Sequence, residues 1–364
     1  MNHLILHVIT TIDLGGAEKQ LLTLAACQKE AGFDVEVIFL KDKPTLLPDF
    51  LDLGIKVDLD FSQLGFLKQC LKLNRRDFQE KSVVHAHLPR AELLCALALK
   101  SKSFIVTRHN SEAFFPKGPA RLSKLLSRFV LSRAFASISI SKAVANYLKT
   151  SGEMSDAQAN HVIYYGIKNT SVSPRSNVRV VSGPIQIGTV SRLVHQKNLP
   201  LLLGAIKELK SQKTPEFNLS IVGSGPLKTE LQSLSADLGI EKLVIWIGQL
   251  EDVVPFYRSL DVFVLTSDYE GFGLVLLEAM SQGLPVIARR ISAIQEVMGE
   301  EHPGLLESNS PHELAEKIRE LVTNDEVLKL YLRYQNLQLQ KFPISKVRLA
   351  HERLYLKALE IAER

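Results

Sequence analysis

The stretch 266–285, TSDYEGFGLVLLEAMSQGLP, has residue types and spacing suited to binding a phosphorylated ligand. Glu270 stands before, and Glu278 within, a run of residues with helical spacing. Gly271 and Gly273 lie at the start of that run, and a glycine turn entering a helix exposes backbone N–H groups at the positive end of the helix dipole. Such a turn favours phosphate binding. Glu278, about two turns along, would contact another part of the same ligand.

A buried strand should hold this turn in place. The preceding run DVFVLTS, 261–267, is apolar and β-branched, as a buried strand requires. Similar runs predict further strands at residues 3–10, 35–40, 55–59, 83–86, 104–107, 136–140 and 184–190. Segments with helix-like patterning separate them, and this alternation predicts parallel, doubly wound sheets. An ordinary turn of such a sheet, with Glu278 merely exposed, is the alternative that these residues leave open.

Length and composition favour two globular domains. At 364 residues the chain exceeds the size at which a single core keeps growing. Its three cysteines form no C-x-x-C pair, so neither a disulfide framework nor a zinc site is indicated. The N-terminal apolar stretch is too short for a signal peptide, and no window reaches the length of a membrane span. We therefore expect a cytoplasmic protein.

Other polar residues lie at the ends of predicted strands, where ligands bind in folds of this type. The first strand leads through DLGGAE, with Gly15 and Gly16, into a predicted helix. This is not a G-x-G-x-x-G motif, so a tight turn explains it equally well. His87 in VHAH and His109 in TRHN end or follow strands. A lone histidine is more often structural, but the position of His109 directly after a strand favours a role in the site.

Two cations, Arg192 and Lys197, lie in the predicted strand-to-helix loop SRLVHQKN. A guanidinium fork and a mobile ammonium suit two neighbouring phosphates, although exposed loop cations are common without such a role. The next loop, IVGSGPL at 221–227, invites a dinucleotide-binding interpretation. That interpretation fails because Lys228 occupies the third glycine position and no carboxylate is placed to hold a ribose.

The first half of the chain is basic. Residues 1–175 hold 23 Lys and Arg against 16 Asp and Glu, whereas residues 176–364 hold 21 against 23. Four cations share one face of a predicted helix at 117–135: Lys117, Arg121, Lys124 and Arg128. Apolar residues form the opposite stripe, which we expect to pack on the sheet: Leu122, Leu125, Leu126, Phe129 and Val130. Together with the basic, apolar segment 66–76, this helix could lie on an anionic membrane or simply face solvent.

The stretch EGFGLVLLEAMSQGLPVIA closely resembles the E-x7-E signature of the retaining, nucleotide-sugar-dependent glycosyltransferases of family 4, which have the GT-B fold. In that family the first glutamate lies by the donor sugar, the intervening loop by the pyrophosphate, and the second glutamate by the ribose hydroxyls. Carried over by motif, the donor-binding residues of this stretch are Glu270, Gly271, Phe272, Gly273, Leu274 and Glu278.

The resemblance gives roles to the other loops as well. GGAEKQL is similar to the N-terminal glycine loop of the family, which implies that Gly15 and Gly16 approach the donor. Arg192 and Lys197 match the R-x4-K pair that stabilises the leaving diphosphate, and His109 matches a histidine that faces the sugar or acceptor. The chain departs from the family pattern at four positions, where the contacts are open: Tyr165 for Asn, Lys168 for Asp, and Ser292 and Ala293 for two glycines.

The family resemblance implies an α/β architecture of the GT-B type, with two Rossmann-like, doubly wound parallel-sheet domains facing across a cleft. We expect an acceptor-side domain at 1–170, a linker at 171–183 and a donor-binding domain at 184–344. A last helix, 345–364, should pack back on the first domain.

The implied activity is that of a retaining hexosyltransferase, in which Glu270, His109, Arg192 and Lys197 act in catalysis. The donor is a nucleoside diphosphate sugar, expected to be UDP-linked, and the acceptor a saccharide or lipid-linked saccharide. Assembly of cell-surface polysaccharide, lipopolysaccharide or lipid-linked glycan is the expected setting. No cofactor, metal ion or nucleic acid is expected, and the protein could be peripheral on the inner face of the membrane. A GT-B epimerase or phosphorylase, or a non-catalytic membrane-recruited scaffold, remains the alternative.

Overall fold

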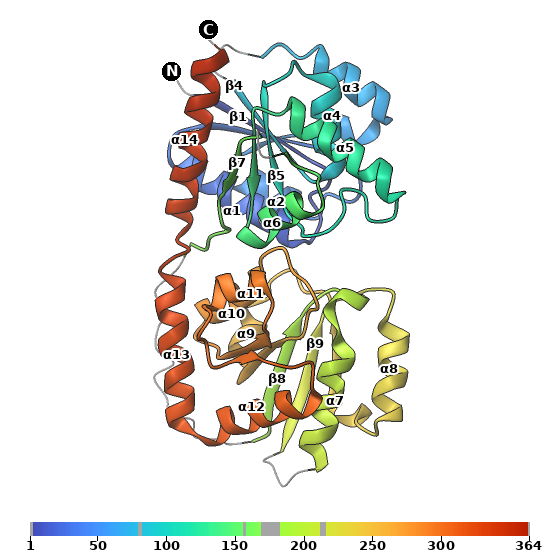
Figure 1. The fold of residues 1–364 in the computed structure, drawn as a ribbon, viewed down its shortest axis with the longest axis vertical. Helices are drawn as coiled ribbons and strands as arrows, with labels where there is room; N and C mark the ends of the chain where they lie inside the picture. The colour runs from blue at the N-terminus through green and yellow to red at the C-terminus, as the bar shows by residue number, and fades with distance from the viewer. Residues whose placement is uncertain (1–2, 79–81, 156–157, 169–182, 212–215, 363–364) are drawn as a thin grey trace. The chain divides into compact units, whose positions relative to one another are not determined.

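The computed structural model describes residues 3–78, 82–155, 158–168, 183–211 and 216–362. It divides into two compact units, the first formed by Met1–Lys168 with Phe342–Arg364 and the second by Asn169–Lys341 (Figure 1). Of the linker predicted at 171–183, only Gly183 lies among the described residues. Each unit contains one parallel sheet with helices on both of its faces (Figure 1).

The first unit is built on a sheet with the strand order β3-β2-β1-β4-β5-β6-β7, and every neighbouring pair is parallel. Its strands are β1 Leu4–Ile9, β2 Asp34–Phe39, β3 Lys56–Asp58, β4 Ser82–His87, β5 Phe104–Arg108, β6 Ala136–Ser139 and β7 Asn160–Val162. Its helices are α1 Gly16–Glu30, α2 Leu47–Asp52, α3 Phe66–Asn74, α4 Pro89–Ala98, α5 Ala120–Arg133, α6 Lys142–Thr150 and α14 Ile344–Ala362. The last helix, α14, packs against α1 and β4.

The second unit repeats this architecture with the strand order β10-β9-β8-β11-β12-β13. Its strands are β8 Ile185–Val190, β9 Phe217–Val222, β10 Val244–Gly248, β11 Val262–Leu265, β12 Val286–Arg289 and β13 Leu305–Leu306. Its helices are α7 Leu199–Ser211, α8 Lys228–Asp237, α9 Val254–Ser259, α10 Leu274–Ser281, α11 Ser292–Met298, α12 Pro311–Thr323 and α13 Asp325–Leu339. The doubly wound parallel sheets predicted from the sequence are confirmed in both units.

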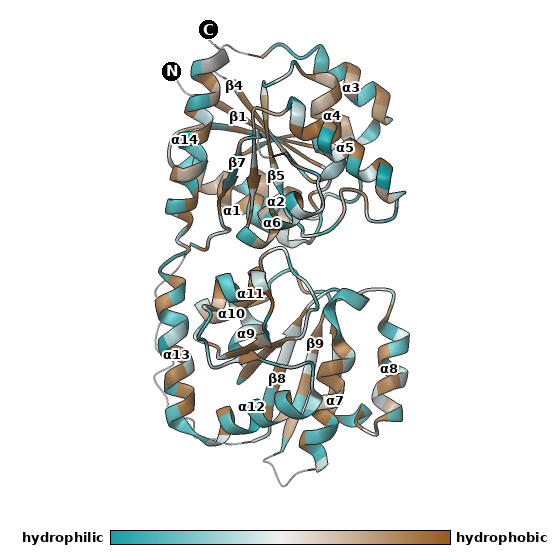
Figure 2. Ribbon diagram, in the orientation of Figure 1, coloured by the Kyte–Doolittle hydropathy of each residue, from teal (hydrophilic) through white to brown (hydrophobic). Residues whose placement is uncertain are grey.

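Apolar strands between two layers of helices explain this architecture. All four residues of β11, Val262–Leu265, are buried, as expected where both faces of a parallel strand are covered. Figure 2 shows the same hydrophobic colour along the central strands of both sheets, such as β1, β8 and β9. Polar residues therefore gather at the strand ends, and the loops that follow the strands become the places where ligand groups can be held.

The prediction for the face of α5 is wrong. Leu122, Leu125 and Phe129 were expected to pack on the sheet, but all three are exposed. The helix instead buries a stripe made of two serines and two apolar residues: Ser123, Ser127, Val130 and Leu131. The small serines let α5 lie close to its neighbours in the unit, and Ser123 Oγ also accepts a hydrogen bond from the backbone N–H of Phe115 at 2.8 Å.

Candidate functional site

The central strands of the second unit bring its predicted site residues together. From β8 the chain builds β9 and β10 on one side, and then returns to place β11 against the other side of β8. The strand order reverses there, and loops at such a switch point form the usual ligand site of an open α/β sheet. Arg192 and Lys197 follow β8, whereas Glu270 and the start of α10 follow β11.

Lys197 and Glu270 form an ion pair between these two loops. The Nζ atom of Lys197 lies 2.5 Å from Oε1 of Glu270, and the two side chains are only 13% and 10% exposed. Ser267 Oγ donates a second hydrogen bond to the same oxygen at 2.6 Å. Limited solvent access strengthens such a pair relative to an exposed one, although the desolvation of both charges opposes it. The pair places a cation and a carboxylate side by side at the switch point.

Hydrogen bonds to backbone carbonyls fix the distance between the same two loops. One is donated by backbone, Asp268 N to Gln196 O at 2.8 Å, and two by side chains, Gln196 Nε2 to Tyr269 O at 2.8 Å and Thr266 Oγ1 to Lys197 O at 2.9 Å. A site held by backbone as well as by side chains is preorganised, because its groups need little rearrangement when a ligand arrives.

Arg192 is supported by a loop whose role the sequence did not reveal. Its side chain is exposed, with Nη2 3.5 Å from Oε1 of Gln196. The loop after β9 lies against the backbone on either side of Arg192, where a Cβ atom on Gly223 would stand 1.8 Å from the carbonyl oxygen of Ser191. Gly225 is equally crowded, 2.4 Å from the carbonyl oxygen of Leu193. These glycines therefore serve close backbone packing, and only the absence of a side chain permits it.

The start of α10 has the geometry expected of a glycine turn entering a helix. Gly273 caps the helix with φ +93°, in the left-handed region, and a Cβ atom there would lie 2.7 Å from Cδ1 of Ile294. Phe272 is buried, so only its backbone can face a ligand, and Leu274 is the first helical residue. Glu278 lies within the helix, and its Oε2 accepts a hydrogen bond from the hydroxyl of Tyr257 at 2.9 Å. The sequence pattern gives no sign of this contact between Tyr257 and Glu278.

In the first unit, the glycine loop contains a carboxylate. Gly15 caps α1 and Gly16 begins it, as the sequence predicts. Glu18, in the first turn, is buried and lies so close that a Cβ atom on Gly15 would stand 2.2 Å from its Oε2. A negative side chain at a helix N-terminus is stabilised by the helix dipole. The position at which the family resemblance would place donor phosphate or sugar is therefore next to a carboxylate of this chain.

His87 and His109 belong to a chain of buried hydrogen bonds. His7 donates from Nε2 to Gln28 Oε1 at 2.9 Å, and its Nδ1 accepts from Nε2 of His87 at 3.0 Å. His87 Nδ1 accepts from Nε2 of His109 at 3.2 Å, and His109 Nδ1 accepts from the Tyr165 hydroxyl at 2.5 Å. With the Gln28 carbonyl facing His7, each ring donates from Nε2 and accepts at Nδ1. His109 is thus held in one tautomer, with both ring nitrogens occupied.

A fourth buried histidine, His85, lies beside this hydrogen-bonded chain. His7 pairs with His85 in the register of β1 and β4, and His85 contacts Thr107 and Tyr355 through its two ring nitrogens. One nitrogen from each of His7, His85 and His87 lies within 4.8 Å of the others, but hydrogen bonds engage both nitrogens of every one of these rings. The alternating positions 85 and 87, facing position 7 on the neighbouring strand, were the available sequence signal.

Three of the four departures from the family pattern now have an explanation. Tyr165 is the hydroxyl donor that fixes His109. Ser292 and Ala293 form the first turn of α11, which begins at Ser292 without left-handed backbone, so glycines are not required there. Lys168 lies 3.7 Å from Glu30 in an exposed ion pair, a contact that contributes little to stability.

Burial keeps these histidines neutral. Desolvation lowers the pKa of His7 and His351 to about 4 and that of His109 to about 3, and it lowers the pKa of His85 and His87 well below the ordinary value of 6.5. The unfolded chain binds protons at these rings below pH 6.5, whereas the folded chain does not until a much lower pH. These histidines therefore lower the free energy of unfolding of the first unit as pH drops below 6.5, and as a group they outweigh Glu92, a buried carboxyl whose pKa is raised to about 7 and which acts in the opposite direction.

We expect acid to destabilise the first unit before the second. Each buried histidine should cost about 1 kcal/mol of unfolding free energy per pH unit between pH 6.5 and its folded pKa. The single tryptophan, Trp246, lies in the second unit and provides an internal control. Thermal unfolding from pH 7.5 to 5 should show the circular dichroism transition shifting further than the Trp246 fluorescence transition. Equal shifts of the two signals would contradict the assignment.

Two family models of glycosyltransferases match this chain, one in each half. A family model described as "Glycosyltransferase Family 4" matches residues 14–170, and one described as "Glycosyl transferases group 1" matches residues 175–336. Together these ranges span most of the chain. The structure of HepE from Anabaena in complex with UDP and glucose superposes with a TM-score of 0.80 at 20% identity, covering 98% of this chain and 100% of that one. This similarity shows the GT-B fold.

Two relatives indicate the biological setting of the family. The lipopolysaccharide core biosynthesis mannosyltransferase LpsB of Rhizobium meliloti is 28% identical over 229 residues, 59% of this chain and 62% of the relative. The N-acetylgalactosamine-N,N'-diacetylbacillosaminyl-diphospho-undecaprenol 4-alpha-N-acetylgalactosaminyltransferase of Campylobacter jejuni is 24% identical over 365 residues, 95% of this chain and 97% of the relative. With both halves matched by family models and the fold by a solved structure, the chain belongs to the glycosyltransferases of family 4.

Proposed function

We propose that this glycosyltransferase moves a hexose from a UDP-linked donor to an acceptor hydroxyl, with retention of configuration at the anomeric carbon. The observation that carries the proposal is the pairing of Lys197 with Glu270 at the switch point of the second sheet. The UDP and glucose in the HepE structure support the choice of donor. Retention is tested by the anomeric configuration of the sugar in the first product formed, as seen by proton NMR.

The second unit would hold the donor through three kinds of contact. Arg192 and Lys197 would stabilise the charge that grows on the departing diphosphate, which is the largest single contribution in many transferases. The N-terminus of α10 at Gly273 would face the phosphates, and Glu278 the ribose. Glu270 would orient the sugar and support its oxocarbenium-like character. This arrangement supplies positive charge from side chains, so we propose that no metal ion or cofactor is needed.

The Lys197–Glu270 pair gives the site a defined state before the donor binds. The Glu270 carboxylate holds the Lys197 ammonium through Oε1. An incoming diphosphate offers a stronger negative charge to the ammonium, and the sugar hydroxyls offer hydrogen-bond donors to the carboxylate. Donor binding would therefore redistribute existing contacts within a fixed frame, and neither group would have to be brought in from solvent.

We propose that the acceptor is a saccharide or lipid-linked saccharide and that His109 positions either the acceptor or the sugar. The Campylobacter relative acts, by its name, on a diphospho-undecaprenol-linked saccharide, and the Rhizobium relative in lipopolysaccharide core synthesis. A ligand hydroxyl that replaced Tyr165 at Nδ1 of His109 would find the ring already in the accepting tautomer. The buried hydrogen-bond chain behind the ring would keep that tautomer in place.

We also propose that the first unit binds an anionic membrane surface, through α3 and α5. On α5, Leu125 is 63% exposed, and Leu122 and Phe129 lie beside it on the exposed surface, while serines are buried. The cations Arg121, Lys124 and Arg128 are exposed on the same helix, so apolar and basic side chains share its outer surface. A helix of this composition can insert its leucines between lipids and place its cations at the phosphates.

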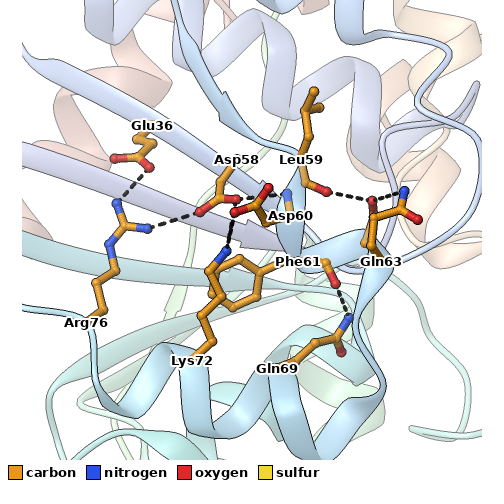
Figure 3. Close-up of polar contacts among 10 residues, drawn as sticks. Glu36, Asp58, Leu59, Asp60, Phe61, Gln63, Gln69, Lys72 and Arg76 are labelled. Atoms are coloured by element: carbon orange, nitrogen blue, oxygen red, sulfur yellow. Dashed lines mark hydrogen bonds and ion pairs between the residues drawn. The ribbon is translucent and has the colours of Figure 1, made fainter.

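Helix α3, like α5, exposes apolar residues, and polar contacts hold its other face against the unit. These contacts join three residues of this segment to their partners: Gln69 to Phe61, Lys72 to Asp58 and Asp60, and Arg76 to Glu36 and Asp58 (Figure 3). The buried Gln69 faces inward, whereas Leu67 is 78% exposed and Leu71 also faces solvent. Lys72 and Arg76 belong to the predicted basic segment, but carboxylates of the same unit pair with both of them. The exposed groups that α3 offers a membrane are therefore mainly Leu67, Leu71 and Lys68.

Charge selects an anionic surface over a neutral one. Residues 101–150 contain nine Lys and Arg and only one acid, Glu112. Helix α4 contacts both α3 and α5 and carries the exposed Leu97, so the three helices can present one apolar, cationic surface (Figure 1). No helix among the described residues is both long enough and apolar enough to cross a bilayer.

We expect Lys197→Ala and Arg192→Ala each to lower turnover by about 100-fold or more, because each removes a charge preorganised for the departing diphosphate. Turnover is measured as nucleoside diphosphate release from UDP-hexoses, with EDTA present throughout. The exposed Lys207 on α7 provides a matched control, since Lys207→Ala removes a cation of the same unit away from the switch point. Near-parent turnover in both site variants, or loss of parent activity with EDTA, would overturn this part of the proposal.

Substitution of Glu270 and of Glu278 should affect different quantities, turnover in the first case and donor binding in the second. Glu270→Gln should mainly lower turnover, because a contact to the reacting sugar strengthens in the transition state. Glu278→Gln should mainly weaken the binding of donor and of UDP, because a ribose contact is equally strong in ground and transition states. Calorimetry with UDP separates the two variants. If Glu278→Gln binds UDP as tightly as the parent while Glu270→Gln binds it weakly, the two roles are reversed.

Vesicle binding tests the membrane surface. The parent should co-sediment with phosphatidylglycerol vesicles at low salt and less at high salt, because ions screen the attraction. Lys124→Glu with Arg128→Glu, and separately Leu122→Gln with Leu125→Gln, should each weaken that binding. The exposed pair Lys228→Glu with Lys242→Glu in the second unit is the charge-matched control. Equal binding to phosphatidylcholine and phosphatidylglycerol vesicles would leave α5 as an ordinary solvated helix.

A further inference from the structure

A short neighbouring helix fixes the side chain of Glu278. Tyr257 and Arg258 lie on α9, and both contact α10. The Tyr257 hydroxyl donates to Glu278 Oε2 at 2.9 Å, and Nε of Arg258 donates to Oε1 of Gln282 at 3.0 Å, one turn further along. Two contacts spaced along α10 tie the helices together. The first of them falls on the carboxylate assigned to the ribose.

The ring of Tyr257 has no room to move. Its side chain is fully buried, and its centroid lies 5.5 Å from that of Phe263 in an edge-to-face arrangement. Phe263 belongs to β11, the strand that leads into the Glu270 turn. The phenol is therefore packed against the same strand that positions the rest of the site. A hydroxyl on so constrained a ring has one direction in which to donate.

The hydroxyl can act only as a protonated donor towards Glu278. Burial and the neighbouring Glu278 carboxylate raise the pKa of Tyr257 well above its ordinary value of 10. A hydrogen bond to an ionised acceptor is among the stronger ones in proteins. Because it engages Oε2, it restricts rotation of the carboxylate plane and so sets the direction in which Oε1 can accept.

We propose that Tyr257 is a positioning residue, which orients the Glu278 carboxylate towards the ribose 2′- and 3′-hydroxyls of the nucleoside diphosphate. The inference rests on the proposed function of Glu278. A carboxylate fixed in one plane accepts from a vicinal diol with both hydrogen bonds aligned. Tyr257 thereby contributes to the preference of the site for a ribonucleotide over its 2′-deoxy analogue.

Calorimetry on a double-mutant cycle tests this positioning role. The probe is the tightest-binding of UDP, GDP and ADP on the parent chain, together with its 2′-deoxy analogue. Tyr257→Phe should lower the affinity for the ribonucleotide by about 2- to 10-fold, the range for loss of one hydrogen bond. It should also reduce the difference in affinity between the ribonucleotide and its 2′-deoxy analogue. In a Glu278→Gln background the same change should have almost no effect, because the group that Tyr257 orients is altered. Turnover at saturating donor should change little.

Tyr331→Phe is the matched control. Tyr331 is also buried in the second unit, and its hydroxyl donates to the carbonyl of Pro303 at 3.3 Å, so its loss costs a similar contact away from Glu278. Both tyrosine variants should unfold at similar temperatures, and only Tyr257→Phe should affect nucleotide binding. Parent-like binding by Tyr257→Phe, or an equal effect in both backgrounds, would overturn the inference. Parent-like binding by Glu278→Gln would instead overturn the ribose role on which it rests.

Discussion

The ion pair between Lys197 and Glu270 is the interaction on which the proposed chemistry of this chain depends. It exists because β8 and β11 are neighbours although they are far apart in the sequence, so the loops that follow them meet. Hydrogen bonds to the backbone carbonyls of those loops, and the close approach of Gly223 and Gly225 to the Arg192 loop, hold the two loops in place. Each charged group is thereby supported by a buried element, which is what preorganisation for a diphosphate requires.

The two units apply the same fold to different tasks. At the switch point of the second sheet the polar groups are charged: Arg192, Lys197 and Glu270. The first unit also contains buried charges, those of Glu18 and Arg108, but its sheet carries a chain of neutral, buried histidines from His7 to His109 that are hydrogen-bonded in one direction. Charged loops suit an anionic donor. Neutral, tautomer-fixed rings suit hydroxyl groups, which is the chemistry expected of an acceptor or a sugar.

Much of this could be predicted from the sequence, because strands and helix starts depend on local patterns. The strand at 261–267, the turn at Gly271 and Gly273 and the helix carrying Glu278 all follow from residues that are adjacent in the chain. Contacts between distant residues could not be predicted. The sequence marks Tyr165 only as a departure from a motif and gives no signal for Tyr257, since the partners of these residues are 56 and 21 residues away. The buried face of α5 could not be predicted either, because the periodicity of its leucines does not show which stripe lies against the rest of the unit.

The central claim is that the switch point of the second unit binds a nucleoside diphosphate sugar through its phosphates. The most direct measurement is the melting temperature of the chain with UDP-, GDP- and ADP-hexoses and with the matching nucleoside monophosphates. One diphosphate sugar at about 100 times its Kd should raise the transition reported by Trp246 by about 5–10 °C, and its monophosphate far less. Equal shifts with the monophosphate and the diphosphate sugar, or no shift with any donor, would contradict the account.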